Sequence, residues 1–482
     1  MNFRLLALLC FCCGCLHAQQ SIRWISSDSV QSWQTKTGAI IQSAGGTADA
    51  EILVNKPLQT IEGFGTCFNE LGWTSLGLLP AADREKILKE MFAPGKGANF
   101  TICRMPIGAN DFSRQWYSYN ETPGDFDMKN FSIANDQETL IPFIKAAMKY
   151  NPSIKLWASP WSPPSWMKTN GHYAARAVNN ADFVSEEWGM DLRKINNGLS
   201  PDKEGREGTD MFLQGESYFN AYALYFTRFI EAYRKEGIKI SMVMPQNEFN
   251  SAQVFPSCTW TAAGLVRFLR ILGPKMDSLK VDLFFGTMER ANHLLADTVL
   301  KDGFCKPFIK GAGFQWAGKD AIAAIHKTYP DLQLYQTEQE CGNSKNDWKY
   351  CKYAWGLMKQ YLSNGANAYT YWNTSLKQGG ISTWGWKQNS LVSVDTVKKT
   401  YRYNYEYYLI KHFSHFIQPG AKRLETSGLF TNLLAFQNPD KSVVVVMQNE
   451  SSAVKKLSLK LGNKQLKATL VADSFNSFLI KP

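Results

Sequence analysis

The feature that most constrains the fold of this chain is an eightfold alternation of short apolar runs with longer polar and amphipathic stretches. Each run leads into polar residues with Gly, Pro, Asn or Trp. The runs are residues 61–68, 99–108, 154–161, 238–249, 280–288, 308–316, 332–342 and 367–373. Helical periodicity follows most of them, over residues 81–92, 140–149, 218–235, 262–276, 320–328 and 348–363. Alternating strands and helices indicate parallel pairing. Eight such units over roughly 350 residues predict a (β/α)8 barrel of the α/β class with inserted loops.

The two ends of the chain have a different pattern. Residues 23–60 carry short alternating runs such as 50–54. After a helical stretch at 407–417, further runs separated by turn residues cover 432–438, 442–448, 455–461 and 468–471. This is typical of an antiparallel β-sandwich. We expect one β-sandwich domain built from both ends, with borders at 19–60, 61–417 for the barrel, and 418–482.

The first eighteen residues resemble a secretory signal. Arg4 precedes an apolar core at 5–15, and Ala18 ends a small-residue cleavage pattern. The apolar run is too short to span a bilayer, and no other segment is apolar enough to do so. Two outcomes remain open: cleavage after Ala18, or lipid attachment at Cys15 after Gly14. Either one predicts an exported protein, which is secreted, periplasmic or held at the cell surface.

Cysteine usage adds little to the choice of function. Four of the ten cysteines lie in the signal, and the six that remain form no CxxC pair, so a zinc ribbon is not expected. Export permits disulfides. Cys341 and Cys351 are the most plausible pair, whereas most of the others are expected as isolated buried thiols.

The basic charge of the chain does not predict nucleic-acid binding. The net charge is +11. The Lys and Arg residues are dispersed, however, and no cluster of them is interleaved with aromatic side chains. Aromatic residues make up 13% of the chain, which is compatible with either a large core or a surface that binds carbohydrate.

Functional residues of a barrel of this kind lie where its strands end and its loops begin. Read along that edge, the sequence places there Arg104, Asp111, Trp161, Asn247, Glu248, Trp316, Glu338 and Trp372. Glu248 and Glu338 end the fourth and seventh strands. Two carboxylates among aromatic walls suit glycoside hydrolysis, in which one is protonated and the other is ionised. Asn247 could hold a sugar hydroxyl, and Arg104 could favour the ionised form of a neighbouring carboxylate. The alternative is that each Glu is a solvated or paired charge on the rim.

The segment WASPWSPPSW at 157–166 is predicted to be a rigid loop on the same rim, because its three prolines forbid a helix and withhold backbone donors. Trp161 is the expected sugar contact. Trp157 lies within the strand and is expected in the core, while Trp166 fits either role.

Five motifs resemble glycoside hydrolase family 30, the retaining enzymes that include glucosylceramidase. They are RMPIGANDFS (104–113), WASPWSPPSWMKTNG (157–171), PQNEF (245–249), TEQECG (337–342) and YWNTSL (371–376). The resemblance runs from about Gly63 to Gln448. It implies that Glu248 is the acid/base and Glu338 the nucleophile. It also implies that a sugar subsite is shaped by Arg104, Asp111, Trp161, Asn247 and Trp372. No metal and no other cofactor are implied.

One departure bears on the substrate. Where glucosylceramidases carry His-Trp-Tyr at the sixth strand, this chain has Phe314, Gln315 and Trp316. Trp316 replaces a phenol hydroxyl with an indole N–H, which donates but cannot accept. The run GFQWAGK, with FPSCTW after the acid/base, is more similar to the β-1,6-glucanase branch. We therefore expect an endo-β-1,6-glucanase acting on β-glucan. The alternatives are a glucosylceramidase or another β-glucosidase, and a non-catalytic carbohydrate-binding protein.

Overall fold

The computed structural model describes residues 22–178, 184–186, 189–193 and 195–481. The predicted signal, with Cys15 and Ala18, lies outside the described residues.

Eight parallel strands close into a barrel, as predicted, in the order β10-β11-β12-β13-β14-β5-β6-β7. Each apolar run contains one of them. The strands are β5 (Gly63–Cys67), β6 (Ile102–Pro106), β7 (Lys155–Ser159), β10 (Ile240–Val243), β11 (Asp282–Met288), β12 (Ile309–Gln315), β13 (Gln333–Glu338) and β14 (Ala368–Asn373). A buried cluster with one residue from each of six of these strands, among them Trp157, Met242 and Phe284, fills the interior.

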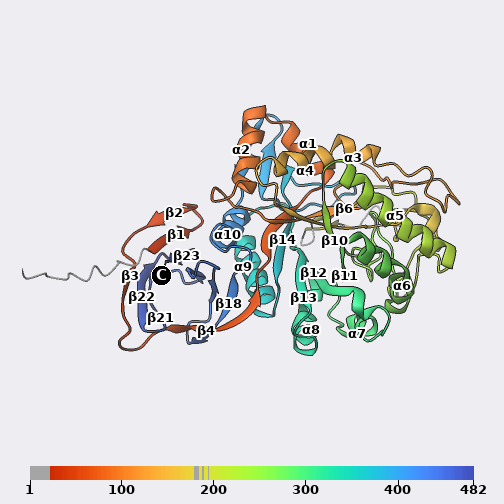
Figure 1. Ribbon diagram of the computed structural model, residues 1–482. Coiled ribbons are helices and arrows are strands. Elements are labelled where there is room, and N and C mark those ends of the chain that lie inside the picture. Colours follow the sequence, from red (N-terminus) through yellow and green to blue (C-terminus); the bar gives the residue numbers. More distant parts are fainter. Residues whose placement is uncertain (1–21, 179–183, 187–188, 194, 482) are drawn as a thin grey trace, which may run out of the picture.

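Helices surround the barrel (Figure 1). The six predicted helices are α2 (Ala81–Phe92), α4 (Leu140–Met148), α5 (Glu216–Lys235), α6 (Ala262–Leu279), α8 (Ile322–Thr328) and α9 (Trp348–Ser363). Three short ones were not predicted: α1 (Glu70–Gly77), α3 (Ala134–Glu138) and α7 (Leu294–Leu300). The first of these depends on a local cap, because the Asn69 side chain accepts the Gly72 N–H at 2.7 Å.

Small elements lie in the segments that connect the barrel strands and helices. β15 (Ser375–Lys377), β16 (Val392–Asp395) and β17 (Thr400–Tyr403) form a three-stranded sheet, and β8 (Val184–Ser185) pairs with β9 (Met190–Asp191). The single-turn helices are η1 (Ser165–Met167), η2 (Pro201–Lys203), η3 (Lys306–Phe308) and η4 (Trp316–Asp320).

The second domain is a ten-stranded sheet drawn from both ends of the chain, which confirms the predicted β-sandwich (Figure 1). Its order is β2-β1-β23-β20-β19-β18-β4-β21-β22-β3. The N-terminal strands are β1 (Ile22–Ser27), β2 (Gln34–Lys36), β3 (Ile40–Ser43) and β4 (Ala50–Thr60). The C-terminal strands are β18 (Lys422–Gly428), β19 (Leu433–Gln437), β20 (Val443–Asn449), β21 (Lys455–Leu461), β22 (Lys464–Leu470) and β23 (Ser474–Ile480). Of these, β18 and β23 were not predicted.

Helix α10 (Tyr405–Ser414) joins the two domains, since it packs against both β5 and β23. The imidazole of His412 is fully buried there, with Nδ1 2.7 Å from Ser477 Oγ and Nε2 2.9 Å from Ser27 Oγ. This ring therefore ties the helix to the first and last strands of the small domain.

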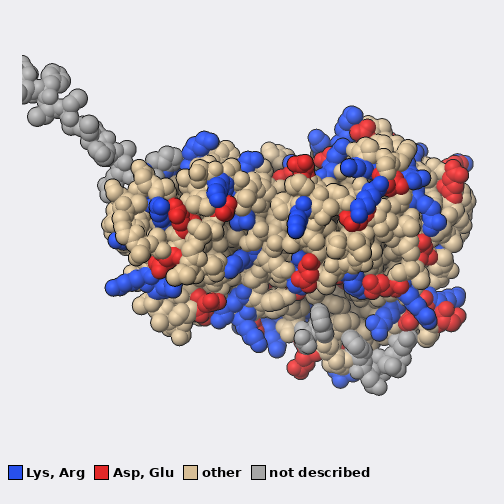
Figure 2. Space-filling view, turned by 90° about the horizontal axis from the view of Figure 1, so that it is seen from below, with Lys and Arg blue, Asp and Glu red and all other residues tan. Residues whose placement is uncertain are grey.

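The predicted disulfide is wrong: Cys341 and Cys351 are separate buried thiols, as are the other four cysteines of the described chain. Cys341 lies in the loop after β13 and Cys351 lies within α9. Basic and acidic side chains are interspersed on the face that Figure 2 shows. Among the described residues, no helix is both long enough and apolar enough to cross a membrane.

Candidate active site

A cavity of about 420 Å³ opens at the carboxyl ends of the barrel strands. Six of the eight predicted site residues line it, namely Asp111, Trp161, Asn247, Glu248, Trp316 and Glu338. The barrel thus brings together residues that lie more than two hundred positions apart in the chain.

Glu248 follows β10 in a strained backbone conformation. Its φ of 45° is in the left-handed region that side chains other than glycine rarely adopt. The Thr287 hydroxyl accepts the Glu248 N–H at 2.9 Å and helps to fix this turn. Such strain is concentrated at functional sites, where the surroundings hold a side chain in one orientation. Here the carboxyl group is directed into the cavity, where Oε1 accepts the Gln315 amide at 2.9 Å.

Glu338 is the last residue of β13, and its carboxylate has a cationic partner. Arg104 donates from Nη1 to Glu338 Oε2 at 2.8 Å. The Gln315 amide nitrogen also donates to this oxygen, at 3.2 Å, and bonds to Glu248 at 2.9 Å. Since one nitrogen bonds to both carboxyl groups, the two oxygens are no more than about 6 Å apart, below the range of about 6.5–9.5 Å for an inverting pair.

The surroundings of the two carboxyl groups differ. Burial raises the pKa of Glu248, whereas the hydrogen bond from Gln315 and the charges of Arg104 and Arg290 act in the opposite direction. Burial also raises the pKa of Glu338 well above its ordinary value; the Arg104 guanidinium acts in the opposite direction, and the charges of Asp111 and Glu248 add to the increase. The only ion pair between the two carboxyl groups and the described cations joins Arg104 to Glu338. Of the two carboxyl groups, Glu338 is therefore the one whose ionised form a direct ion pair stabilises.

Arg104 lies beneath the cavity rather than on its wall. Its side chain is 0% exposed, and its guanidinium lies 4.9 Å from the Trp157 ring centre and 4.3 Å from that of Trp161. Nη2 donates to Asn247 Oδ1 at 2.7 Å. The buried cation thus orients both an amide and a carboxylate of the cavity, while its direct contact with a ligand stays a prediction.

Trp372 is also fully buried and does not line the cavity. Its ring stacks on Trp161 at a centroid distance of 5.0 Å, and its indole donates to Asp111 Oδ2 at 3.2 Å. Asp111 Oδ1 has no hydrogen-bond partner among the described residues. Burial, together with the charge of Glu248, raises the pKa of Asp111 to about 7. Trp372 therefore supports a wall that contains the Trp161 ring and a carboxyl oxygen without a hydrogen-bond partner among the described residues.

The segment 157–166, predicted to be a loop, begins within β7 and ends in η1, so only its middle is a loop. Its three indoles have different positions, as the sequence suggests. Trp157 is 1% exposed and belongs to the barrel core. Trp161 lines the cavity. Trp166, whose role the sequence left open, is half-buried and donates to Asn120 O at 3.0 Å. It anchors the loop from outside the cavity.

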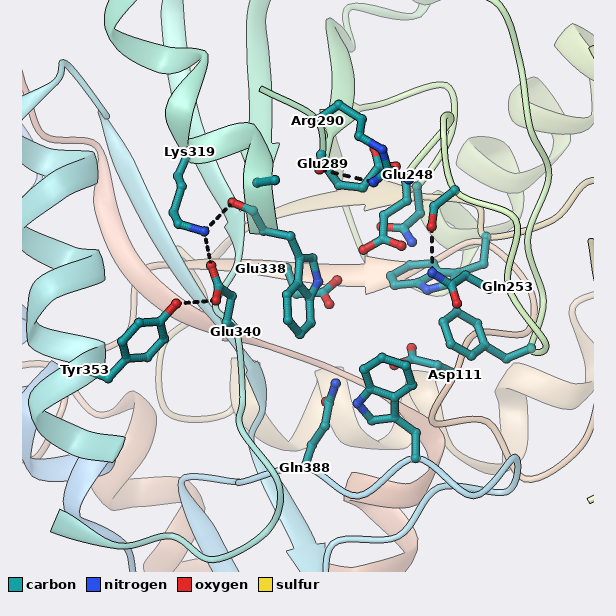
Figure 3. A pocket seen from close by; sticks show the side chains of 17 residues that line it. Asp111, Glu248, Gln253, Glu289, Arg290, Lys319, Glu338, Glu340, Tyr353 and Gln388 are labelled. Carbon is teal, nitrogen blue, oxygen red and sulfur yellow. Dashed lines mark hydrogen bonds and ion pairs between the residues drawn. The ribbon is translucent and has the colours of Figure 1, made fainter. Parts of the chain in front are cut away.

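Sequence reasoning missed several residues of the cavity. The sequence pattern marks Gln315, the bridge between the two carboxyl groups, only as part of a departure from the family pattern. Its place as the last residue of β12 was the available signal. Glu289 and Arg290, which follow β11, line the cavity as well. Figure 3 shows them beside Glu248.

A second polar cluster lies across the cavity. Glu340 accepts a hydrogen bond from Lys319 at 2.9 Å and another from the Tyr353 hydroxyl at 2.5 Å (Figure 3). No group of three His, Cys, Asp or Glu side chains in the described ranges is placed to hold a metal ion. The cavity offers a close pair of carboxyl groups in unlike surroundings, open polar acceptors and indole faces, which together can protonate one atom of a ligand and attack another.

Two family models match nearly the whole described chain. The glycosyl hydrolase family 30 TIM-barrel domain matches residues 61–186 and 202–417, and the glycosyl hydrolase family 30 beta sandwich domain matches residues 420–478.

Similar proteins include enzymes with two kinds of substrate. A putative glucosylceramidase of Caenorhabditis elegans is 31% identical over 437 residues, which cover 85% of this chain and 77% of that protein. An endo-1,6-β-D-glucanase of Aspergillus fumigatus is 28% identical over 426 residues, which cover 81% of this chain and 78% of that protein. Among solved structures, the endo-β1,6-glucanase BT3312 superposes with a TM-score of 0.76 at 24% identity, covering 96% of this chain and 100% of that one. The last comparison supports the fold.

Proposed function

Because the chain belongs to glycosyl hydrolase family 30, we propose that this glycosyl hydrolase is a retaining β-glucosidic enzyme whose substrate is β-1,6-glucan, cleaved within the chain. The observation that carries the mechanism is the Gln315 bridge, which holds the carboxyl groups of Glu248 and Glu338 at a spacing that suits double displacement.

In the first step, Glu338 attacks the anomeric carbon as a carboxylate. The bond from that carbon to the leaving oxygen breaks, and Glu248 gives its proton to this oxygen. A glycosyl ester of Glu338 results. In the second step, Glu248 takes a proton from water, the water oxygen bonds to the anomeric carbon, and the ester bond breaks to restore the carboxylate. Two inversions give net retention.

The neighbouring residues support these roles. The Arg104 guanidinium stabilises Glu338 as an anion before attack and after release. The Gln315 amide can hold both carboxyl groups in place in either protonation state. Asn247 and the open oxygen of Asp111 supply groups for the hydroxyls of the attacked glucose, and the Trp161 ring offers its face to the sugar.

The choice of β-1,6-glucan is supported by the polar character of the cavity. Its wall carries Glu289, Arg290, Lys319, Glu340 and Gln388 besides the catalytic pair, and few aliphatic groups. Such a wall suits sugar hydroxyls better than the two acyl chains of a ceramide. A β-1,6 link has one rotatable bond more than other links between ring carbons, so the glucan chain can bend into a short cavity. Glucosylceramide is kept as the second candidate because similar proteins include a putative glucosylceramidase.

Export is part of the proposal. The first eighteen residues would direct it, and the mature chain would hold the barrel at 61–417 between the sandwich segments 19–60 and 418–482. The mass of the mature N-terminus distinguishes cleavage after Ala18 from a lipid at Cys15.

The test is to incubate the protein with β-1,6-glucan, β-1,3-glucan, xylan and glucosylceramide and to analyse the products by chromatography and proton NMR. We expect β-1,6-linked oligosaccharides whose new reducing ends are first in the β configuration. Initial α products would refute retention. Rapid glucose release from glucosylceramide without cleavage of β-1,6-glucan would refute the substrate. Binding of a glucan without any turnover would favour a non-catalytic carbohydrate-binding protein.

A further inference from the structure

A third carboxyl group, Glu289, lies beside the proposed acid/base. It follows directly on β11, the barrel neighbour of β10, after which Glu248 projects. Both side chains line the same cavity. In Figure 3, Glu289 and Arg290 lie on the Glu248 side of the cavity, away from Lys319 and Glu340.

Glu289 is buried with its hydrogen-bonding capacity unused. The residue is 3% exposed, and neither carboxyl oxygen has a hydrogen-bond partner among the described residues. Arg290 Nη1 lies 2.9 Å from Glu289 Oε1 as an ion pair, without the geometry of a hydrogen bond. Glu207 accepts a hydrogen bond from Nε of the same arginine at 3.0 Å, so the guanidinium is held from the far side.

Glu340 provides the comparison. It is a buried carboxyl group on the wall of the same cavity, but Lys319 and Tyr353 donate to its two oxygens. Leaving a buried polar group without hydrogen bonds costs about 1–3 kcal/mol. A ligand with hydroxyl groups would remove this cost at Glu289 and gain nothing comparable at Glu340.

We propose that Glu289 binds the leaving sugar, exchanging hydrogen bonds with hydroxyls on the ring that departs when the glycosidic bond breaks. The inference rests on the proposed function, because the acid/base must face the leaving oxygen and Glu289 is its neighbour on that side. The ligand class is a polyhydroxylated leaving group, such as the next glucose unit of a β-glucan.

The protonation of Glu289 suits this role. Burial, with the charge of Glu248 added, raises the pKa of Glu289 to about 8. The Arg290 guanidinium acts in the opposite direction. When the carboxyl group carries a proton, it both donates and accepts. It can pair with a sugar hydroxyl in either orientation.

The test compares two substrates in the variants Glu289→Ala and Glu289→Gln. One substrate is the β-linked diglucoside that the wild type cleaves fastest. The other is 4-nitrophenyl β-glucoside. Its leaving group, 4-nitrophenol, carries no hydroxyl group other than the one that cleavage produces. We expect Glu289→Ala to lower kcat/KM for the diglucoside by about 10- to 100-fold and that for the aryl glucoside by less than about 3-fold. Glu289→Gln keeps a donor and an acceptor and should recover part of the loss.

Glu207→Gln is the matched control. It removes the other carboxylate partner of Arg290 from an exposed position outside the cavity. We expect both kcat/KM values to stay near those of the wild type. An equal loss on both substrates in Glu289→Ala, or no loss on either, would overturn the inference. The inference would also be overturned if the wild-type enzyme cleaved the aryl glucoside but no diglucoside. If the wild-type enzyme cleaved only diglucosides of another linkage, the β-1,6 proposal would be refuted. The same comparison of variants would still test whether Glu289 binds the leaving sugar.

Discussion

The buried cation beneath the cavity provides the sharpest test of the mechanism. Arg104→Gln would remove the positive charge 2.8 Å from Glu338 Oε2 and leave a side chain that can still donate a hydrogen bond. It would also remove the cation from its place among the indoles of Trp157 and Trp161. Because Arg104 lowers the pKa of Glu338, this pKa should rise in the variant.

The size of the change follows from the lost contact. A hydrogen bond to a charged group contributes about 1.5–3 kcal/mol, which corresponds to about 1–2 pKa units. Glu338 acts as a nucleophile only when it is ionised, so its pKa in the free enzyme sets the acidic limb of kcat/KM. A higher pKa moves this limb to higher pH. We expect a shift of about 1–2 units and activity that is lost first on the acidic side.

The assay is kcat/KM for 4-nitrophenyl β-glucoside from about pH 4 to about pH 9. Arg104→Lys is the matched variant, because it keeps the positive charge but loses the planar guanidinium group. The acidic limb of its pH profile should move less than that of Arg104→Gln. Circular dichroism and thermal unfolding would show that each variant is folded. A folded Arg104→Gln protein with an unmoved acidic limb and a uniformly lower kcat/KM would refute the electrostatic role.

Glu338→Gln should abolish turnover without changing Tm, and turnover at the wild-type rate would exclude Glu338 as the nucleophile. Glu248→Ala should retain some activity on aryl glucosides, because their leaving groups need little protonation, and added azide should increase that activity. Trp316→Tyr, which restores a phenol at the cavity wall, should change the ratio of activities on β-1,6-glucan and glucosylceramide; an unchanged ratio would remove this residue from the account of specificity. Burial lowers the pKa of His412 from 6.5 to about 3, so the neutral ring stabilises the fold above pH 6.5 and this contribution is lost as the pH falls towards 3. Between about pH 6.5 and pH 4.5, the free energy of unfolding of His412→Gln should fall by about 2 kcal/mol less than that of the wild type. Urea titration at the two pH values would measure this, and equal losses would contradict it.

The sequence was sufficient for the barrel because each strand is a contiguous apolar run that ends in polar or aromatic residues. Helices α2 and α9 begin and end at the predicted residues. Strands β18 and β23 were missed because their pattern is weak. Lys422–Gly428 has a single fully buried residue, and Ser474–Ile480 mixes serines and an asparagine into a buried strand.

Only part of the candidate site could be predicted from the sequence, and the reason is geometric. A residue at a strand end can be predicted to lie near the rim, but its height in the barrel depends on register. Arg104 and Trp372 are therefore buried outside the cavity lining, while Trp161 lies on its wall. Gln315 carries no charge and stands in no acid/base pattern, so its bridging position is visible only when β10, β12 and β13 are placed together.

The pairing of β1 with β23 sets an order of assembly. Trp24 donates to the side chain of Asn476, a residue 452 positions later, and β23 lies between β1 and β20 in the sheet. During synthesis from the N-terminus, the first strand has no partner on this side until the last strand is complete, whereas every barrel strand is available earlier. The pairing of β23 between β1 and β20 therefore cannot form before the last strand has been synthesised. A chain shortened by the last nine residues would expose two unpaired sheet edges, which are sites of aggregation.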